Sequence, residues 1–144
     1  MKKNLILIAG VLLLATVYVI FFTDWFKPKI IQISHTARPG VGRGDDAVPM
    51  LAFGLDNEYE LTDIKVVRVS DLQADKDPQP LWHLVSEGSD FINHFRYGEN
   101  IAGMDPAVDG SKPGALEPGV TYRLFVVAGK AHGQHDFQVK SAAK

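Results

Sequence analysis

The stretch TYRLFVVAGKAHGQHDFQV, residues 121–139, decides the fold expected for this chain. Its first half places an apolar side chain at every second position, which puts these side chains on one face of a strand: Tyr122, Leu124, Val126 and Ala128. Gly129 to Gly133 then supplies a hairpin connection to the run HDFQV. The pattern therefore predicts two neighbouring strands that pair antiparallel.

The same rhythm of short apolar stretches, separated by Gly, Pro, Asp and Asn clusters, continues upstream as far as residue 29. It predicts five further strands, at 30–36, 48–55, 61–69, 81–85 and 91–97, the last of which could instead begin a helical turn. Trp82 is expected in the core. About seven short strands joined by turns predict an all-β domain, an antiparallel sandwich whose two sheets each bury one face.

Leu116, Pro118 and Tyr122 in LEPGVTY follow the spacing L-x-P-x-x-x-Y. This motif resembles the start of the penultimate strand in fibronectin type III domains and in other immunoglobulin-like sandwiches. The resemblance covers residues 116–139 and implies a tyrosine corner, in which the Tyr122 hydroxyl donates to a buried upstream backbone acceptor. It also implies a scaffold for spacing, adhesion and docking. Phe53 stands in the region where fibronectin domains carry an early core tryptophan.

An uncharged run of 18 residues, LILIAGVLLLATVYVIFF at 5–22, precedes the predicted domain. As a helix it would be roughly 27 Å long, close to the hydrocarbon thickness of a bilayer. No small-x-small cleavage site follows Tyr18, so we interpret the run as a retained signal anchor, against a cleaved signal peptide or a buried core helix. A predicted membrane-interface belt follows it, made of Trp25, Phe26, Lys27 and Lys29.

The anchor divides the chain into a tail, transmembrane anchor and interfacial segment at 1–28 and a β-sandwich domain at 29–144. Basic residues flank the span on both sides, but the four-residue N-terminal tail favours a cytoplasmic N-terminus and a periplasmic, extracytoplasmic domain. Small or polar positions in the span suit packing against other membrane helices, and these candidates are Ala9, Gly10 and Thr16.

Composition and motifs argue against several classes of function. Lys and Arg total 15 against 17 Asp and Glu, so the net charge of −2 offers no basic field to nucleic acid. With no cysteine, the chain has no disulfide, thiol nucleophile or thiolate metal site. No phosphate-binding loop, nucleophile elbow or zinc-protease motif occurs, so we expect neither an enzyme nor a cofactor. The Arg-Gly-Asp triplet at 43–45 is interpreted as a glycine-rich turn.

His132, His135 and Asp136 in AHGQHDF form the strongest metal-like cluster. Two residues three apart on a strand face opposite sides, so chelation by both histidines would require His132 to bend back within the turn. We interpret the three as polar hairpin residues and expect no tight metal site there. Isolated histidines beside aromatic residues are more often packed and hydrogen-bonded than ligating; the chain has three, His35, His83 and His94.

The function we predict is that of a non-catalytic, single-span accessory or structural subunit. Its sandwich would dock on the extracytoplasmic face of a larger photosynthetic, respiratory or envelope complex, so its partners would be the lipid bilayer and other subunits. The Gly- and Pro-rich segment at 100–119 is a candidate docking loop. The alternative, from another class, is a membrane-tethered periplasmic binding module for a metal or small ligand.

Overall fold

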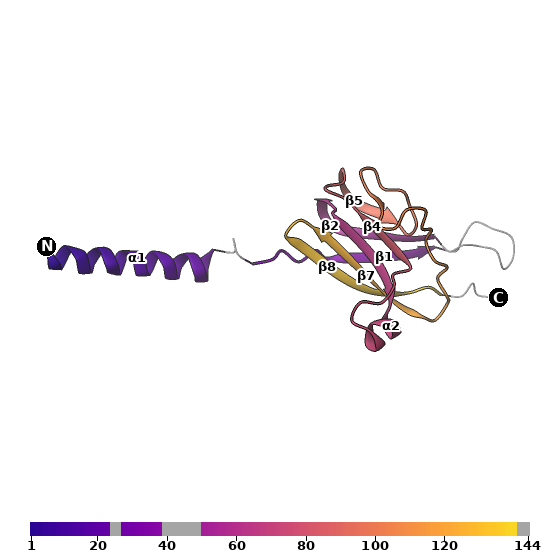
Figure 1. The fold of residues 1–144 in the computed structure, drawn as a ribbon, viewed down its shortest axis with the longest axis horizontal. Coiled ribbons are helices and arrows are strands. Elements are labelled where there is room, and N and C mark those ends of the chain that lie inside the picture. The colour runs from indigo at the N-terminus through magenta and orange to yellow at the C-terminus, as the bar shows by residue number, and fades with distance from the viewer. Residues whose placement is uncertain (24–26, 39–49, 141–144) are drawn as a thin grey trace.

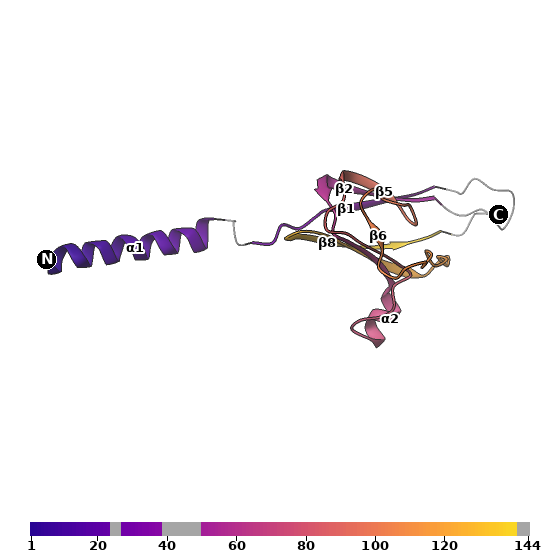
Figure 2. The same ribbon diagram turned by 45° about the horizontal axis from the view of Figure 1, so that its top comes forward.

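The structure is a computed structural model that describes residues 1–23, 27–38 and 50–140 (Figures 1 and 2). Trp25, Phe26 and the Arg-Gly-Asp triplet at 43–45 therefore lie outside the described residues, as do the first residues of the strand predicted at 48–55.

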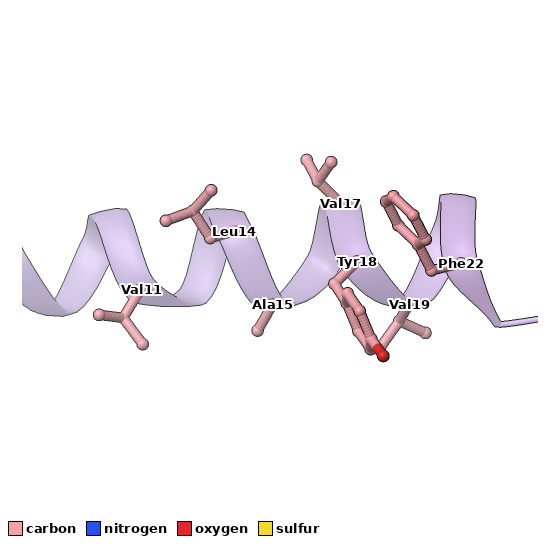
Figure 3. A pocket seen from close by; sticks show the side chains of 7 residues that line it. All are labelled: Val11, Leu14, Ala15, Val17, Tyr18, Val19 and Phe22. Atoms are coloured by element: carbon pink, nitrogen blue, oxygen red, sulfur yellow. The ribbon is translucent and has the colours of Figure 1, made fainter.

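The N-terminal helix α1 spans Lys2–Phe22 and is long and apolar enough to cross a membrane. None of its residues is buried, as they would be in the core helix of a soluble domain. Seven of its side chains, between Val11 and Phe22, project from several sides of the helix and carry only one polar atom, the Tyr18 hydroxyl oxygen (Figure 3). A helix that is apolar all round needs an apolar environment. The predicted apolar helix of spanning length is confirmed.

The described residues beyond α1 form mainly two antiparallel sheets, which Figure 2 shows as two layers. The three-stranded sheet has the order β1-β2-β5 and consists of β1 (Ile33–Arg38), β2 (Met50–Glu60) and β5 (Phe91–Arg96). The five-stranded sheet has the order β6-β4-β3-β7-β8 and consists of β3 (Asp63–Arg68), β4 (Trp82–Val85), β6 (Asp105–Pro106), β7 (Thr121–Ala128) and β8 (Ala131–Gln138). The prediction of a mostly β domain with two antiparallel sheets is confirmed.

Several element bounds differ from the sequence prediction. The turn of the β7–β8 hairpin holds only Gly129 and Lys130, because β8 begins at Ala131 instead of after Gly133. Gly129 has a φ of +61°, the left-handed conformation that such two-residue turns require. A short helix, α2 (Val69–Ala74), was not predicted and follows β3 directly. The stretch at 91–97 forms strand β5 and does not begin a helical turn.

The core lies between the two sheets and is rich in aromatic rings. The predicted apolar face of β7 is confirmed, since Tyr122, Leu124 and Val126 are all 0% exposed. Trp82 is 5% exposed, which confirms its predicted place in the core. Rings of the two sheets meet across the core, with centroids 5.1 Å apart for Phe53 and Phe137 and 6.2 Å apart for Trp82 and Phe95.

The predicted contact at Tyr122 exists, but its direction is the reverse of the expected one. The Tyr122 hydroxyl oxygen accepts a hydrogen bond of 2.7 Å from the backbone N–H of Glu117. The loop points the Glu117 N–H at the Tyr122 hydroxyl oxygen, so this oxygen acts as the acceptor for a backbone donor. Leu116 packs against the core, and Pro118 lies in a bridge with Val139. The motif LEPGVTY therefore forms a closed corner at the start of β7.

Candidate functional site

The segment that joins α1 to the sandwich, residues 29–32, is itself part of the sandwich. The Ile31 N–H donates to the His132 carbonyl at 2.8 Å, and the His132 N–H donates to the Lys29 carbonyl at 3.0 Å. Ile30 accordingly forms a parallel bridge with His132, at the start of β8. The Ile31 side chain is 2% exposed. The chain therefore pairs first with the five-stranded sheet and then crosses to the three-stranded sheet as β1 (Figure 1).

Polar contacts hold the other side of this junction. The Gln32 N–H donates to Oδ1 of Asp56 at 3.3 Å, and the Asp56 N–H donates to the Gln32 carbonyl at 3.1 Å. The Tyr59 hydroxyl donates to the same carboxylate oxygen at 3.0 Å, and burial together with this carboxylate raises the pKa of Tyr59. The Lys29 ammonium lies 5.1 Å from the Tyr59 ring centroid, in cation–π geometry. Lys29, predicted to lie at the headgroup level, thus contacts the sandwich.

The close approach of the Ile31 backbone to β8 depends on Gly133. A Cβ atom at this position would overlap with the Ile31 carbonyl oxygen and lie 3.0 Å from the Ile31 Cβ. Both obstacles are close to the backbone and cannot rotate away. Glycine is the residue that permits a strand and a second backbone to come this close. Gly133 therefore allows residues 29–31 to pair with β8.

The three residues of the predicted metal-like cluster do not converge. Along β8, His132 and Asp136 face outward, whereas His135 is half-buried on the inner face. Asp136 is held by Arg123 on β7, with Nε and Nη2 donating to its two carboxylate oxygens at 2.6 and 2.9 Å. This contact lowers the pKa of Asp136 and raises that of Arg123. Within residues 1–23, 27–38 and 50–140, no three His, Asp or Glu side chains come close enough to hold a metal ion.

His135 instead meets His35 on β1, a partner that sequence reasoning missed. Nδ1 of His35 lies 2.7 Å from Nε2 of His135, and the ring centroids are 4.9 Å apart. The Phe137 ring lies 6.1 Å from the His35 ring. Burial, and then the neighbouring His35, lower the pKa of His135 against the opposing effect of Asp136. The pair sits where the edges of the two sheets, β1 and β8, come together.

The remaining histidines are hydrogen-bonded, as expected, but only one is sheltered. Nε2 of His83 lies 3.1 Å from an Asp63 oxygen and is half-buried. Nδ1 of His94 lies 2.7 Å from the Asn93 side-chain oxygen on an exposed part of β5. Neither lies in a cluster with further ligands within the described part of the chain.

The predicted docking loop at 100–119 contains the edge strand β6 and packs along its neighbour β4 in the five-stranded sheet. The Gly114 N–H donates to the Leu81 carbonyl at 2.8 Å, and the Tyr97 hydroxyl donates to the Gly114 carbonyl at 2.7 Å. Two residues of the loop itself, Ile101 and Met104, are buried. Val108, in contrast, is 69% exposed. Both ends of the loop therefore contact the domain, whereas its middle, around Val108, is exposed to solvent.

The three packing candidates of the span differ in what they offer a neighbouring helix. The Thr16 hydroxyl donates to the Leu12 carbonyl at 2.8 Å, so its donor is already used within α1. A Cβ added at Gly10 would meet nothing within 4 Å. Ala9 lies beside Gly10 on the exposed helix surface. Close approach at Ala9 and Gly10 is thus the main contribution that these residues could make to helix packing.

Comparison of the chain with protein-family models, with curated proteins and with solved structures finds no match in any of the three. The resemblance to fibronectin type III domains accordingly rests on LEPGVTY and its surroundings.

The stability of the domain should fall as the pH drops below 6.5, the ordinary pKa of a histidine. His135 has a lowered pKa when folded, so on acidification the unfolded chain takes up this proton first and is favoured. The stability that neutral His135 contributes is fully present above the pKa of the unfolded chain. It is lost progressively as the pH falls from that value to the lower pKa of the folded chain. Denaturant midpoints between about pH 7.5 and about pH 5 measure it.

The control for this pH dependence is His135→Gln, which cannot be protonated. We expect a flatter dependence in the variant over the same pH range. Asp136 does not interfere, because its pKa lies below its ordinary 3.8 and its contribution is lost only in stronger acid. Equal slopes in both proteins would contradict the assignment to His135.

Proposed function

We propose that this chain is a non-catalytic, single-span accessory or structural subunit whose sandwich docks on the extracytoplasmic face of a larger membrane protein complex. The observation that carries this proposal is the junction at residues 29–32, which is hydrogen-bonded to both sheets. Only residues 23–28 separate α1 from that paired segment. Six residues reach at most about 20 Å, so the sandwich is held close to the end of the span.

This arrangement suits a fixed neighbour. A long flexible linker would let a tethered domain search for mobile ligands, whereas a short linker and a paired junction restrict both its distance and its orientation. The restriction lowers the ordering cost of binding a partner that is itself fixed in the same membrane. An accessory subunit beside other membrane subunits has such partners.

The sandwich itself is part of the proposal, as an immunoglobulin-like and specifically fibronectin type III-like domain. Three features support it. Strands β1, β2 and β5 share one sheet and β3, β7 and β8 the other, which is the division of strands in immunoglobulin-like folds. The Tyr122 hydroxyl bonds to an upstream backbone group. Leu116 and Pro118 stand at the motif spacing. Such sandwiches serve as scaffolds, although fold alone does not define function.

A second candidate function is a membrane-tethered binding module for a metal or small ligand. The observation that favours it is the contact between His35 and His135, two potential ligands brought together from opposite ends of the domain sequence. Lipid and neighbouring helices would still surround α1 in this case.

Native sizing after extraction in mild detergent tests the proposed function. We expect the chain to migrate within a large assembly, because the sandwich and the span would both contact other subunits. Migration near the mass of a single chain in its micelle would contradict the proposal and favour the tethered binding module.

The contribution of the span to this assembly can be measured in the same experiment. Gly10→Leu should reduce co-purification while leaving membrane insertion intact, because it blocks close helix approach but adds apolar bulk. Ile8→Leu is the matched control, since it conserves volume at a position about 200° around the helix. Replacement of the span by poly-Leu is the stricter form. Undiminished co-purification would place the docking energy in the sandwich and its loop at 100–119.

Topology is the third element of the proposal, with the N-terminus in the cytoplasm and the domain outside. It is supported by Lys2 and Lys3, two positively charged residues directly before the apolar run. Protease added to intact spheroplasts should remove the domain and leave a fragment that contains α1. Full protection of the domain, with cleavage after lysis, would reverse the orientation.

A further inference from the structure

We propose that His35 and His135 form a two-imidazole site for a divalent transition-metal ion, with Cu²⁺ preferred over Zn²⁺. This site does not depend on docking to a complex. It differs from the cluster suggested by the sequence, because His132 and Asp136 face away from it on the outer side of β8.

The distance between the two nitrogens is close to the one a shared ion requires. Nδ1 of His35 and Nε2 of His135 are 2.7 Å apart. Imidazole nitrogens bind zinc at about 2.0–2.1 Å, so two of them on one ion are separated by about 2.9 Å at a right angle and about 3.4 Å in a tetrahedron. The two nitrogens must therefore part by less than about 1 Å, and each ring must turn so that its lone pair points at the ion instead of at the other nitrogen. His35 is exposed on an edge strand, so its side chain can make this adjustment.

The proton balance also permits binding. In the neutral pair, one of the two facing nitrogens carries the hydrogen that it donates to the other. When a metal ion enters, that hydrogen moves to the second nitrogen of the same ring, and both facing nitrogens offer a lone pair. No net proton is released and no group is oxidised.

The surroundings set the metal preference and the strength of the site. Imidazole ligands suit copper and zinc, and divalent copper binds more tightly than zinc to a given nitrogen site. The described residues supply no third His, Asp or Glu ligand, so water or a group from a ligand fills the remaining positions. Phe137 flanks the pair, and Asp136 is engaged by Arg123 on the other face. The site is therefore weaker than a complete protein cage and open to a further ligand.

Metal binding at this position would also stabilise the fold. His35 lies on β1 of the three-stranded sheet, whereas His135 lies on β8 of the five-stranded sheet. An ion held by both would bridge the two sheets at an edge where β1 and β8 are not paired with each other. Because it binds only the folded chain, its effect on the unfolding temperature would rise with its concentration.

The test uses the full chain in detergent micelles, titrated with CuCl₂ and separately with ZnCl₂ in a non-chelating buffer. Calorimetry should detect one equivalent of Cu²⁺, and affinity should fall at least tenfold in His35→Ala and in His135→Ala. His132→Ala and His94→Ala are matched controls and should bind as the native chain does. Electron paramagnetic resonance should report two imidazole nitrogens on the bound copper, and the ion should raise the unfolding temperature of the native chain only while both histidines are present.

Circular dichroism of each variant separates loss of a ligand from loss of the fold. The edge position of His35 makes His35→Ala the decisive variant. Unchanged binding in a folded His35→Ala protein would overturn the proposal, as would dependence on His132. Absence of copper binding by the native chain would overturn it as well.

Discussion

Gly133→Ala should destabilise the domain by roughly 2 to 4 kcal/mol, the largest single-residue effect expected at the junction. The new methyl group cannot coexist with the Ile31 carbonyl oxygen, so residues 29–31 must leave β8. Two backbone hydrogen bonds are then lost and the Ile31 side chain becomes exposed. Denaturant unfolding of the full chain in detergent, followed by tryptophan fluorescence, measures the change.

Gly54→Ala is the matched control for this experiment. Its new Cβ would approach only the Ser34 hydroxyl, at 3.0 Å, and that hydroxyl can rotate away. We expect a change well below that of Gly133→Ala. Trypsin should also cut faster after Lys29 in Gly133→Ala, because the segment is no longer paired. Equal stability and equal cleavage in the two variants would show that residues 29–31 do not depend on close approach to β8.

Tyr122→Phe should destabilise the domain by about 1 kcal/mol or more. The ring remains, and with it the packing against Phe137, but the Glu117 N–H loses the oxygen that accepts its hydrogen bond at 2.7 Å. The bond is part-buried, so water replaces the lost oxygen only incompletely and the Glu117 N–H bears part of its desolvation cost. The shift in thermal or denaturant midpoint measures it.

Glu117→Gln tests the same corner without touching this hydrogen bond. It removes the ion pair between Arg68 and Glu117, whose nitrogen and oxygen lie 3.2 Å apart. The Glu117 side chain is 62% exposed and that of Arg68 36%, so water screens this pair and we expect little change in stability. If Tyr122→Phe were as mild as this control, LEPGVTY would be an ordinary loop, and the support that it lends to a fibronectin type III-like domain would disappear.

Features of the fold that depend on local pattern were predictable from the sequence. The uncharged run at 5–22 forms a helix, and the alternation in TYRLFVV forms a strand with its apolar face inward. Helix α2 was not predictable in this way, because its six residues are too few for a helical period to stand out. Strand β6 has two residues, one of them proline, and was missed for the same reason.

Features that depend on contacts between distant residues were not predictable. Nothing in AHGQ favours a strand locally. These residues join β8 because β7 pairs with them on one side and residues 29–31 pair with His132 on the other. His35 and His135 are 100 positions apart, so no spacing rule relates them. Sequence reasoning did place His132 and His135 on opposite faces, but it could not find the partner of His135.

Residues 29–31 pair with β8 of the five-stranded sheet before the chain enters β1 of the other sheet. This pairing affects the order in which the domain folds during synthesis. Ile31 leaves the ribosome about one hundred residues before His132, its hydrogen-bonding partner, at a rate of roughly 5–20 residues per second. As the proposed anchor, α1 would reach the bilayer seconds before β8 exists to cover Ile31. Until then the nascent domain lacks both its closing strand and the attachment that orients it. Premature termination before Ala131 would leave a chain with Ile31 uncovered, and an exposed apolar segment of this kind is a substrate for quality-control proteases.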